Sequence, residues 1–177
     1  FVHLGSGNYN EDTARLYTDI GLLTTNEVLA NAVSEFLNVI TGHSMPSQYQ
    51  NLITAPRDMR NQLIEFIEKE AENARNGLLS GVFIKVNSLE DSEIIYALYR
   101  ASQSGVTVKL IIRGICCLRP GRVGLSDNIE VISIVGDFLE HSRIYHFHNN
   151  GKTRTYAGSA DMMVRSFDKR LESLFQI

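Results

Sequence analysis

The sequence predicts a mixed α/β fold, and three observations support this. Short apolar segments suited to β-strands alternate with segments whose apolar residues recur at helical spacing. Residues 82–112 have strand, amphipathic helix and strand in succession, which indicates parallel strands joined by a right-handed crossover. A Gly-Ser turn occurs twice, at residues 5–8 and 158–161, each time after a strand-like segment. We therefore expect a mixed-sheet domain with helices on its faces, preceded by the tail of a second copy.

The first fifty residues are expected to form the truncated copy. Residues 1–4 and 16–23 can extend as strands, and residues 26–42 have the periodicity of an amphipathic helix. Pro46 lies among small and polar residues at positions 44–50, which is typical of a linker. This divides the chain into residues 1–50, the C-terminal part of a first domain, and residues 51–177, a second domain.

The second domain is expected to begin with a strand at residues 52–54. Pro56 is suited to the first turn of the following helix, and Gly77 ends that helix. Further strands are predicted at residues 82–86, 106–112, 129–135, 144–148 and 153–157, with a helix between the first two of these. Because ligands collect beyond the carboxyl ends of parallel strands, Arg113, which follows one of them, is a candidate ligand-binding residue.

Composition sets limits on the class of protein. A chain of 177 residues with 44% hydrophobic residues can bury one sizeable core. The net charge of -3 means that any binding of a polyanion depends on locally gathered Arg and Lys. No apolar run approaches the roughly 20 residues of a membrane span, and no charged-then-apolar N-terminal segment suggests export, so a cytoplasmic protein is expected. The adjacent Cys116 and Cys117 are interpreted as core thiols rather than a disulfide.

The two Gly-Ser turns belong to a longer repeat. Residues 2–8 align with residues 155–161, and at the same offset Asp19 aligns with Glu172. Both copies thus contain a strand, a Gly-Ser turn ending in Asn or Asp, and an acidic residue at a fixed distance. Gly-Ser could simply form two tight turns, but a Gly, a Ser, an Asx and an acid shared at one offset favour a repeated functional unit.

A candidate phosphoryl-transfer site surrounds His141. On an extended backbone His141 and Arg143 project to the same side. An imidazole can act as a nucleophile toward phosphorus, and a guanidinium can neutralise the charge of the transferring group. Glu172 is predicted to hold the imidazole in its reactive tautomer. The alternative is that His141 is an ordinary strand histidine beside a surface arginine. The sequence repeat and Arg113 at a strand end favour the functional interpretation over this alternative.

The pattern of His-x-Arg, a Gly-Ser turn and a further acid resembles the phospholipase D superfamily. Longer segments are similar to bacterial polyphosphate kinases of the long-chain-forming type, and this resemblance extends over essentially the whole chain. It rests on residues 3–10, 13–19, 110–116, 117–121, 133–135 and 138–143.

The resemblance implies reversible transfer of the terminal phosphate of ATP to inorganic polyphosphate through a phosphohistidine, with Mg²⁺ present. By position in the family's motifs, the implied catalytic residues are His141 and Glu172. The implied ATP- or phosphate-binding residues are Tyr17, which would stack on the nucleotide, Arg113, His141, Arg143 and Arg170.

The resemblance also implies that part of the site lies outside this sequence. The family's phosphorylated histidine belongs to a His-x-Lys upstream of the first Gly-Ser turn, and His3 is not its equivalent because it aligns with Tyr156. The Mg²⁺ ligands are likewise expected upstream, and no metal ligand is predicted here. We therefore expect the isolated chain to be inactive and the whole protein to be a homo-oligomer without a nucleic-acid partner. Two alternatives stay open, a phospholipase D-type phosphodiesterase and a non-catalytic polyphosphate-binding module.

Overall fold

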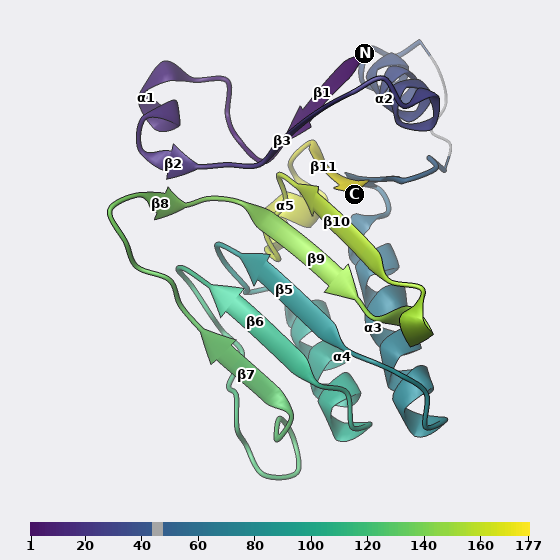
Figure 1. Ribbon diagram of the computed structural model, residues 1–177, viewed down its shortest axis with the longest axis vertical. Helices are drawn as coiled ribbons and strands as arrows, with labels where there is room; N and C mark the ends of the chain where they lie inside the picture. The colour runs from purple at the N-terminus through teal and green to yellow at the C-terminus, as the bar shows by residue number, and fades with distance from the viewer. Residues whose placement is uncertain (44–47) are drawn as a thin grey trace.

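The computed structural model describes residues 1–43 and 48–177 (Figure 1). Its main feature is a seven-stranded mixed sheet in the order β4-β11-β10-β9-β5-β6-β7. Strands β5, β6 and β7 are parallel, and the remaining neighbours are antiparallel. The strands are β4 (Leu52–Ala55), β5 (Val82–Val86), β6 (Val108–Ile112), β7 (Ile129–Ile132), β9 (Arg143–Phe147), β10 (Arg154–Gly158) and β11 (Glu172–Gln176).

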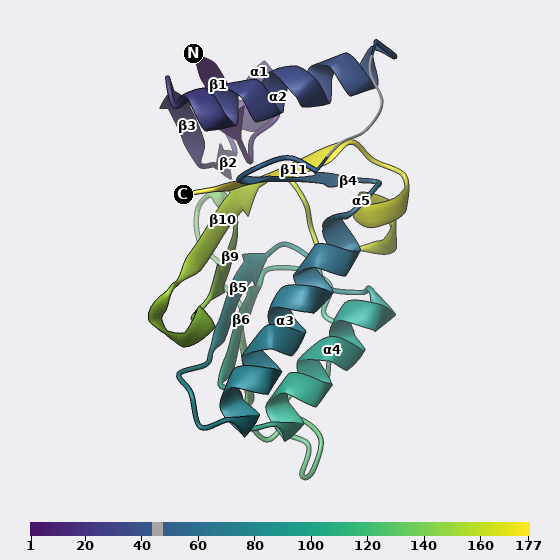
Figure 2. The ribbon, with the colours of Figure 1, turned by 90° about the vertical axis from the view of Figure 1, so that its right-hand side faces the viewer.

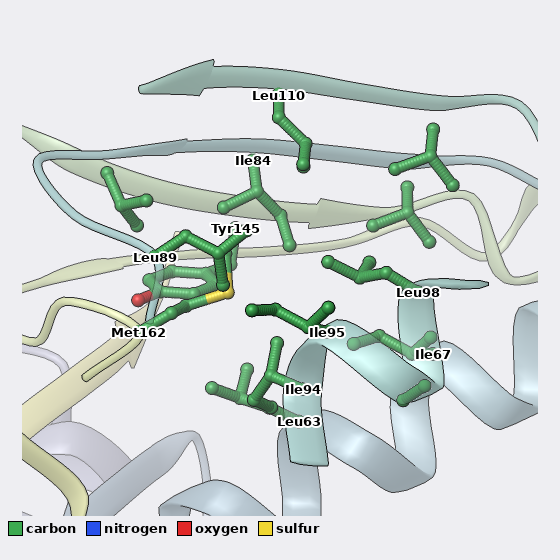
Figure 3. Close-up of a cluster of buried hydrophobic side chains, with 14 of the residues drawn as sticks. Leu63, Ile67, Ile84, Leu89, Ile94, Ile95, Leu98, Leu110, Tyr145 and Met162 are labelled. Carbon is green, nitrogen blue, oxygen red and sulfur yellow. The ribbon is translucent and has the colours of Figure 1, made fainter. Parts of the chain in front are cut away.

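Two helices, α3 (Met59–Arg75) and α4 (Ser92–Gln103), lie side by side on one face of this sheet (Figure 2). Strand β5 alternates as expected, with Val82, Ile84 and Val86 buried. Their side chains and those of neighbouring strands meet apolar residues of both helices in the main core (Figure 3). The side chain of Asp91 caps α4 by accepting a hydrogen bond from Ile94 N. Among the described residues no helix is both long enough and apolar enough to span a membrane.

The first forty residues form a small lobe above one edge of the sheet (Figures 1 and 2). Its core packs against the sheet, because Leu4, Leu29 and Ala32 share one cluster with Ala157 of β10 and Phe175 of β11. The two lobes are also joined by parallel pairing of β2 with β8. The elements involved are β1 (Val2–Gly5), α1 (Glu11–Ala14), β2 (Tyr17–Thr18), β3 (Gly21–Thr24), α2 (Glu27–Ile40) and β8 (Leu139–Glu140).

Several sequence predictions need correction. The strand expected at residues 16–23 is divided into β2 and β3, because these pair with different partners, β8 and β1. Pro56 does not lie in the first helical turn, since residues 56–58 form a turn closed by Asp58 N donating to Thr54 O, and α3 begins at Met59.

Other boundaries shift by smaller amounts. Strand β6 begins at Val108 and β7 ends at Ile132, while β9 and β10 are each displaced by one residue from prediction. A short 3-10 helix (Asn149–Gly151) connects β9 to β10, and α5 (Val164–Asp168) precedes β11. Cys116 and Cys117 are exposed rather than core residues, because they lie in the loop after β6. Residues 44–47 of the predicted linker lie outside the described part of the chain.

Candidate active site at the sheet edge

The candidate site lies at the edge of the sheet that faces the small lobe (Figure 1). Strands β5 and β6 are parallel, so Asn87 and Arg113, which follow their carboxyl ends, come to the same edge. Strand β9 runs the opposite way, and therefore His141, which precedes it, also lies there. The register that pairs Arg143 with Gly158 brings the second Gly-Ser turn to the same place. The topology thus brings residues that are far apart in the sequence to one edge of the sheet.

Three consecutive residues of the small lobe hold His141. Its Nδ1 lies 2.8 Å from Asp19 Oδ1, its backbone N–H donates to Thr18 O at 3.0 Å, and the ring of Tyr17 stacks on the imidazole with centroids 4.5 Å apart. The side chain of His141 is only 10% exposed. When Nδ1–H donates to the carboxylate, Nε2 is left as the unprotonated nitrogen, which is the form of a nucleophile or a general base.

Arg143 joins the imidazole to both lobes. Its Nη2 donates to Asp161 Oδ2 at 3.0 Å, and its Nη1 donates to the backbone oxygens of Ser6 at 3.2 Å and His141 at 2.9 Å. Asp161 also accepts a hydrogen bond from Asn87 N at 2.7 Å. The guanidinium is buried, and its donors are largely engaged by the protein. Arg143 therefore holds His141 in place through these hydrogen bonds. Its Nη1 also lies 3.1 Å from His141 Nε2.

The surroundings of His141 favour the neutral imidazole. Burial lowers the pKa of His141, and the positive charges of Arg143 and Arg113 lower it further, while the hydrogen bond to Asp19 opposes them. The balance is a pKa below its ordinary value, so the ring is uncharged near neutral pH.

The sequence repeat is also a structural repeat. In the small lobe Ser6 Oγ donates to Asp19 Oδ1 at 2.7 Å and accepts from Ile20 N at 3.0 Å. In the large lobe Ser159 Oγ donates to the carboxylate of Glu172 and accepts from the backbone N–H of the following residue, Ser173, at 3.3 Å. The strand pairing has the same register in both, with Gly5 opposite Gly21 and Gly158 opposite Leu174. Asp19 and Glu172 are thus equivalent carboxylates in two copies of one unit.

The carboxylate beside His141 is Asp19, whereas the sequence prediction placed Glu172 there. Glu172 instead bonds to Ser159 within its own copy. Burial raises the pKa of the Glu172 carboxyl, although the Ser159 hydrogen bond and two arginines oppose this. The repeat had marked Asp19 as the equivalent of Glu172, but it does not reveal which copy's imidazole each carboxylate contacts.

The remaining predicted binding residues are distributed around this centre. Arg113 is partly buried and donates from Nη1 to Glu140 O at 3.2 Å. Tyr17 lines a hollow of about 300 Å³ together with Asn8, Tyr9 and Asp19. Arg170 is exposed just before β11, where its charge acts on the carboxyl of Glu172.

Two polar residues of β5 and its carboxyl end were missed by the sequence prediction. Lys85 Nζ donates to Ser142 O at 3.0 Å and lies 3.1 Å from Glu140 Oε2. With its amide oriented to match its neighbours, Asn87 donates to Glu140 O at 2.8 Å and accepts from Arg143 Nη2 at 2.8 Å. Polar residues at the carboxyl end of a buried strand were the available signal.

The described residues do not form a metal site by themselves. Within residues 1–43 and 48–177 no group of three or more His, Cys, Asp or Glu could hold a metal ion. His146 on β9 has its Nδ1 2.8 Å from Thr155 Oγ1, and His148 lies outside that strand.

The seven-stranded mixed sheet with helices on one face is a phospholipase D-like fold. A solved phospholipase D family member, Nuc from Salmonella typhimurium, aligns over 71% of this chain and 82% of its own, with a TM-score of 0.50 and 16% identity, which supports the fold alone. Family models described as polyphosphate kinase C-terminal domain 2 and domain 1 match residues 52–177 and 1–46. The chain belongs to the polyphosphate kinase family.

Individual relatives agree with this assignment. The chain is 53% identical over all 177 residues to a polyphosphate kinase of Staphylococcus haemolyticus and 49% identical to one of Synechocystis, and it covers 24% of each of these proteins. The crystal structure of polyphosphate kinase from Porphyromonas gingivalis aligns with a TM-score of 0.93 and 39% identity, over 99% of this chain and 27% of that chain. The chain thus spans about a quarter of the length of these relatives.

Proposed function

We propose that the protein containing this chain is a polyphosphate kinase that reversibly transfers the terminal phosphate of ATP to inorganic polyphosphate through a phosphohistidine. The observation that carries the proposal is the His141–Asp19 pair, a neutral and ordered imidazole with Arg113 and Arg143 around it, in a chain of this family. His141 would lie at the reacting phosphoryl group. Its unprotonated Nε2 can accept a proton or contact phosphorus, and the nearby guanidinium groups favour the developing negative charge.

The structural repeat supports a two-histidine site. Asp19 of one copy holds the histidine of the other copy, and Glu172 occupies the equivalent position in its own copy. By the same relationship Glu172 would hold an imidazole contributed by the first copy. The repeat has no such histidine within the sequence, since His3 aligns with Tyr156. The phosphorylated histidine would therefore come from a His-x-Lys outside this chain, and Glu172 would be its positioning carboxylate.

The binding roles follow from where each side chain lies. Tyr17 stacks on His141 with one face and lines the neighbouring hollow, which would take the nucleotide base. Arg113 and the exposed Arg170 would bind the phosphates of ATP or polyphosphate. Arg143 would act mainly by holding His141 and by lowering its pKa, because its donors are already engaged.

Further properties of the whole protein belong to the same proposal. Mg²⁺ would balance the phosphate charge, with ligands supplied outside this chain. We propose a division near residue 50, supported by the separate family matches at residues 1–46 and 52–177. We further propose a cytoplasmic homo-oligomer that uses ATP and polyphosphate and does not bind nucleic acid.

The test uses the full-length protein with ATP labelled on its terminal phosphate. We expect acid-labile, base-stable phosphate on the protein and a growing polyphosphate polymer, both reduced strongly by His141→Ala. The isolated chain of 177 residues should show no turnover. Release of an alcohol from a phosphodiester without nucleotide would instead support a phospholipase D-type hydrolase. Polyphosphate binding without any phosphoryl transfer would support a binding module.

A further inference from the structure

Lys85 lies on β5, an interior strand of the sheet, and contacts the residues on both sides of His141. Its ammonium nitrogen donates to the backbone oxygen and the hydroxyl of Ser142 and pairs with the carboxylate of Glu140. An ammonium group has three donors, and here three acceptors surround it. The side chain of Lys85 is only 14% exposed, so these contacts are shielded from water.

The backbone of His141 and Ser142 lies beyond the end of the strand pairing. Pairing between β5 and β9 ends at Lys85 and Ile144, and neither His141 nor Ser142 belongs to a strand. On the small-lobe side His141 N donates to Thr18 O. On the opposite side no backbone pairing of β5 reaches Ser142, and the side chain of Lys85 takes the carbonyl of Ser142 in its place.

We propose that Lys85 is a positioning residue that fixes the backbone of residues 140–142 and thereby the imidazole of His141. The expected effect on kcat rests on the proposed function, whereas the expected effect on the position of the imidazole does not. Lys85 acts through His141 rather than on phosphate, because its donors are engaged by Glu140 and Ser142. A displacement of a reacting group by about 1 Å can cost on the order of 100-fold in rate, which is why such support matters.

The substitution Lys85→Met keeps most of the aliphatic side chain and removes the three donors. Lys109→Met is the matched control, since Lys109 lies on the neighbouring strand, opposite Phe83, and is exposed beside Glu130. In the full-length enzyme we expect Lys85→Met to lower kcat at least about tenfold with KM for ATP changed less than about threefold. Lys85→Arg should recover part of the loss, and Lys109→Met should leave both constants unchanged.

Two kinetic results would overturn the proposal. One is a kcat of Lys85→Met within twofold of the wild type. The other is a large rise in KM at unchanged kcat, which would make Lys85 a direct phosphate ligand. Thermal unfolding of each variant shows whether it is still folded. Partial recovery of kcat in Lys85→Arg would also argue against a general loss of folding.

A second measurement does not depend on kinase activity. Diethyl pyrocarbonate modifies unprotonated imidazoles, and peptide mass spectrometry reports the rate at each histidine. We expect His141 to react at least about fivefold faster in Lys85→Met than in the wild type, with exposed His43 as the internal reference. An unchanged rate at His141 contradicts the positioning role. An inactive wild-type enzyme with faster labelling in the variant would instead reject the proposed function and retain the inference.

Discussion

Asp19 Oδ1 lies 2.8 Å from His141 Nδ1, although the two residues are 122 positions apart and belong to different lobes. The same carboxylate oxygen accepts the hydroxyl of Ser6, so the Gly-Ser turn of one copy orients the carboxylate that holds the imidazole of the other. The site is therefore assembled only when the lobes are packed together, and pairing of β2 with β8 fixes that packing beside it.

This pair predicts a large effect for Asp19→Asn in the full-length enzyme. An amide nitrogen can donate to Nδ1 and favour the tautomer with the proton on Nε2, which removes the reactive nitrogen. Loss of the equivalent carboxylate in other catalytic triads costs about 10⁴-fold, and we expect kcat to fall by about 10²- to 10⁴-fold. Asp12→Asn, an exposed acid on α1, is the control. A kcat of Asp19→Asn within threefold of the wild type would exclude a catalytic role for this contact.

The mixed α/β class, the parallel strand-helix-strand unit at residues 82–112 and the place of Arg113 at its carboxyl end could be predicted from sequence, but the order of the seven strands could not. Apolar alternation in β5 and helical spacing in α4 reflect burial against one core, and Arg113 reaches the edge of the sheet because it follows the last residue of β6. The partner of His141 could not be predicted, because contacts between the lobes depend on tertiary packing. Lys85 was missed for a similar reason, since Ser142, which accepts two of its hydrogen bonds, is 57 residues away in the sequence.

The pH dependence of activity should reflect His141. Its pKa is below the ordinary value, so the neutral reactive form persists to lower pH than for a free histidine, and activity is lost only as pH falls through this lowered pKa. Arg113 is one of the charges that lower it. Arg113→Gln should therefore move the acidic limb of kcat/KM to higher pH and raise KM for ATP. Arg100→Gln, distant on α4, should do neither. A limb that moves to lower pH in Arg113→Gln would contradict this electrostatic assignment.

Glu172 gives a prediction that separates stability from activity. Burial raises its pKa, so its contribution to folding is fully present below the ordinary pKa of a glutamate and is lost as pH rises through the raised value. Glu172→Gln keeps the shape without the charge. We expect the Tm of Glu172→Gln to equal or exceed that of the wild type at pH 8, and the difference in Tm to be smaller or absent at pH 4. Kinase activity of the full-length variant should fall strongly. Glu65→Gln on the exposed face of α3 should change none of these. A Tm several degrees below wild type at pH 8 would argue against the raised pKa.

Glycine at the first position of the Gly-Ser turns tests whether the two copies share one packing requirement. A Cβ on Gly158 would lie 2.0 Å from Ser173 O and 3.0 Å from Leu174 Cα, and both are backbone atoms held by pairing of β10 with β11. A Cβ on the equivalent Gly5 would lie 3.1 Å from Ile20 O, a contact that a small shift can relieve.

Gly158→Ala should therefore lower the free energy of unfolding by more than about 2 kcal/mol, because the strands must separate to admit the methyl group. Gly5→Ala should cost less, and Gly136→Ala, which faces open space, should cost within about 0.5 kcal/mol. Urea unfolding of the three variants provides the comparison. Equal stability of Gly158→Ala and Gly136→Ala would show that β10 and β11 are not held at this separation. A loss of stability that decreases from Gly158→Ala to Gly5→Ala to Gly136→Ala would instead show that close approach of the two backbones requires glycine at the turn. The same close approach lets Ser159 reach Glu172 across the strand pair.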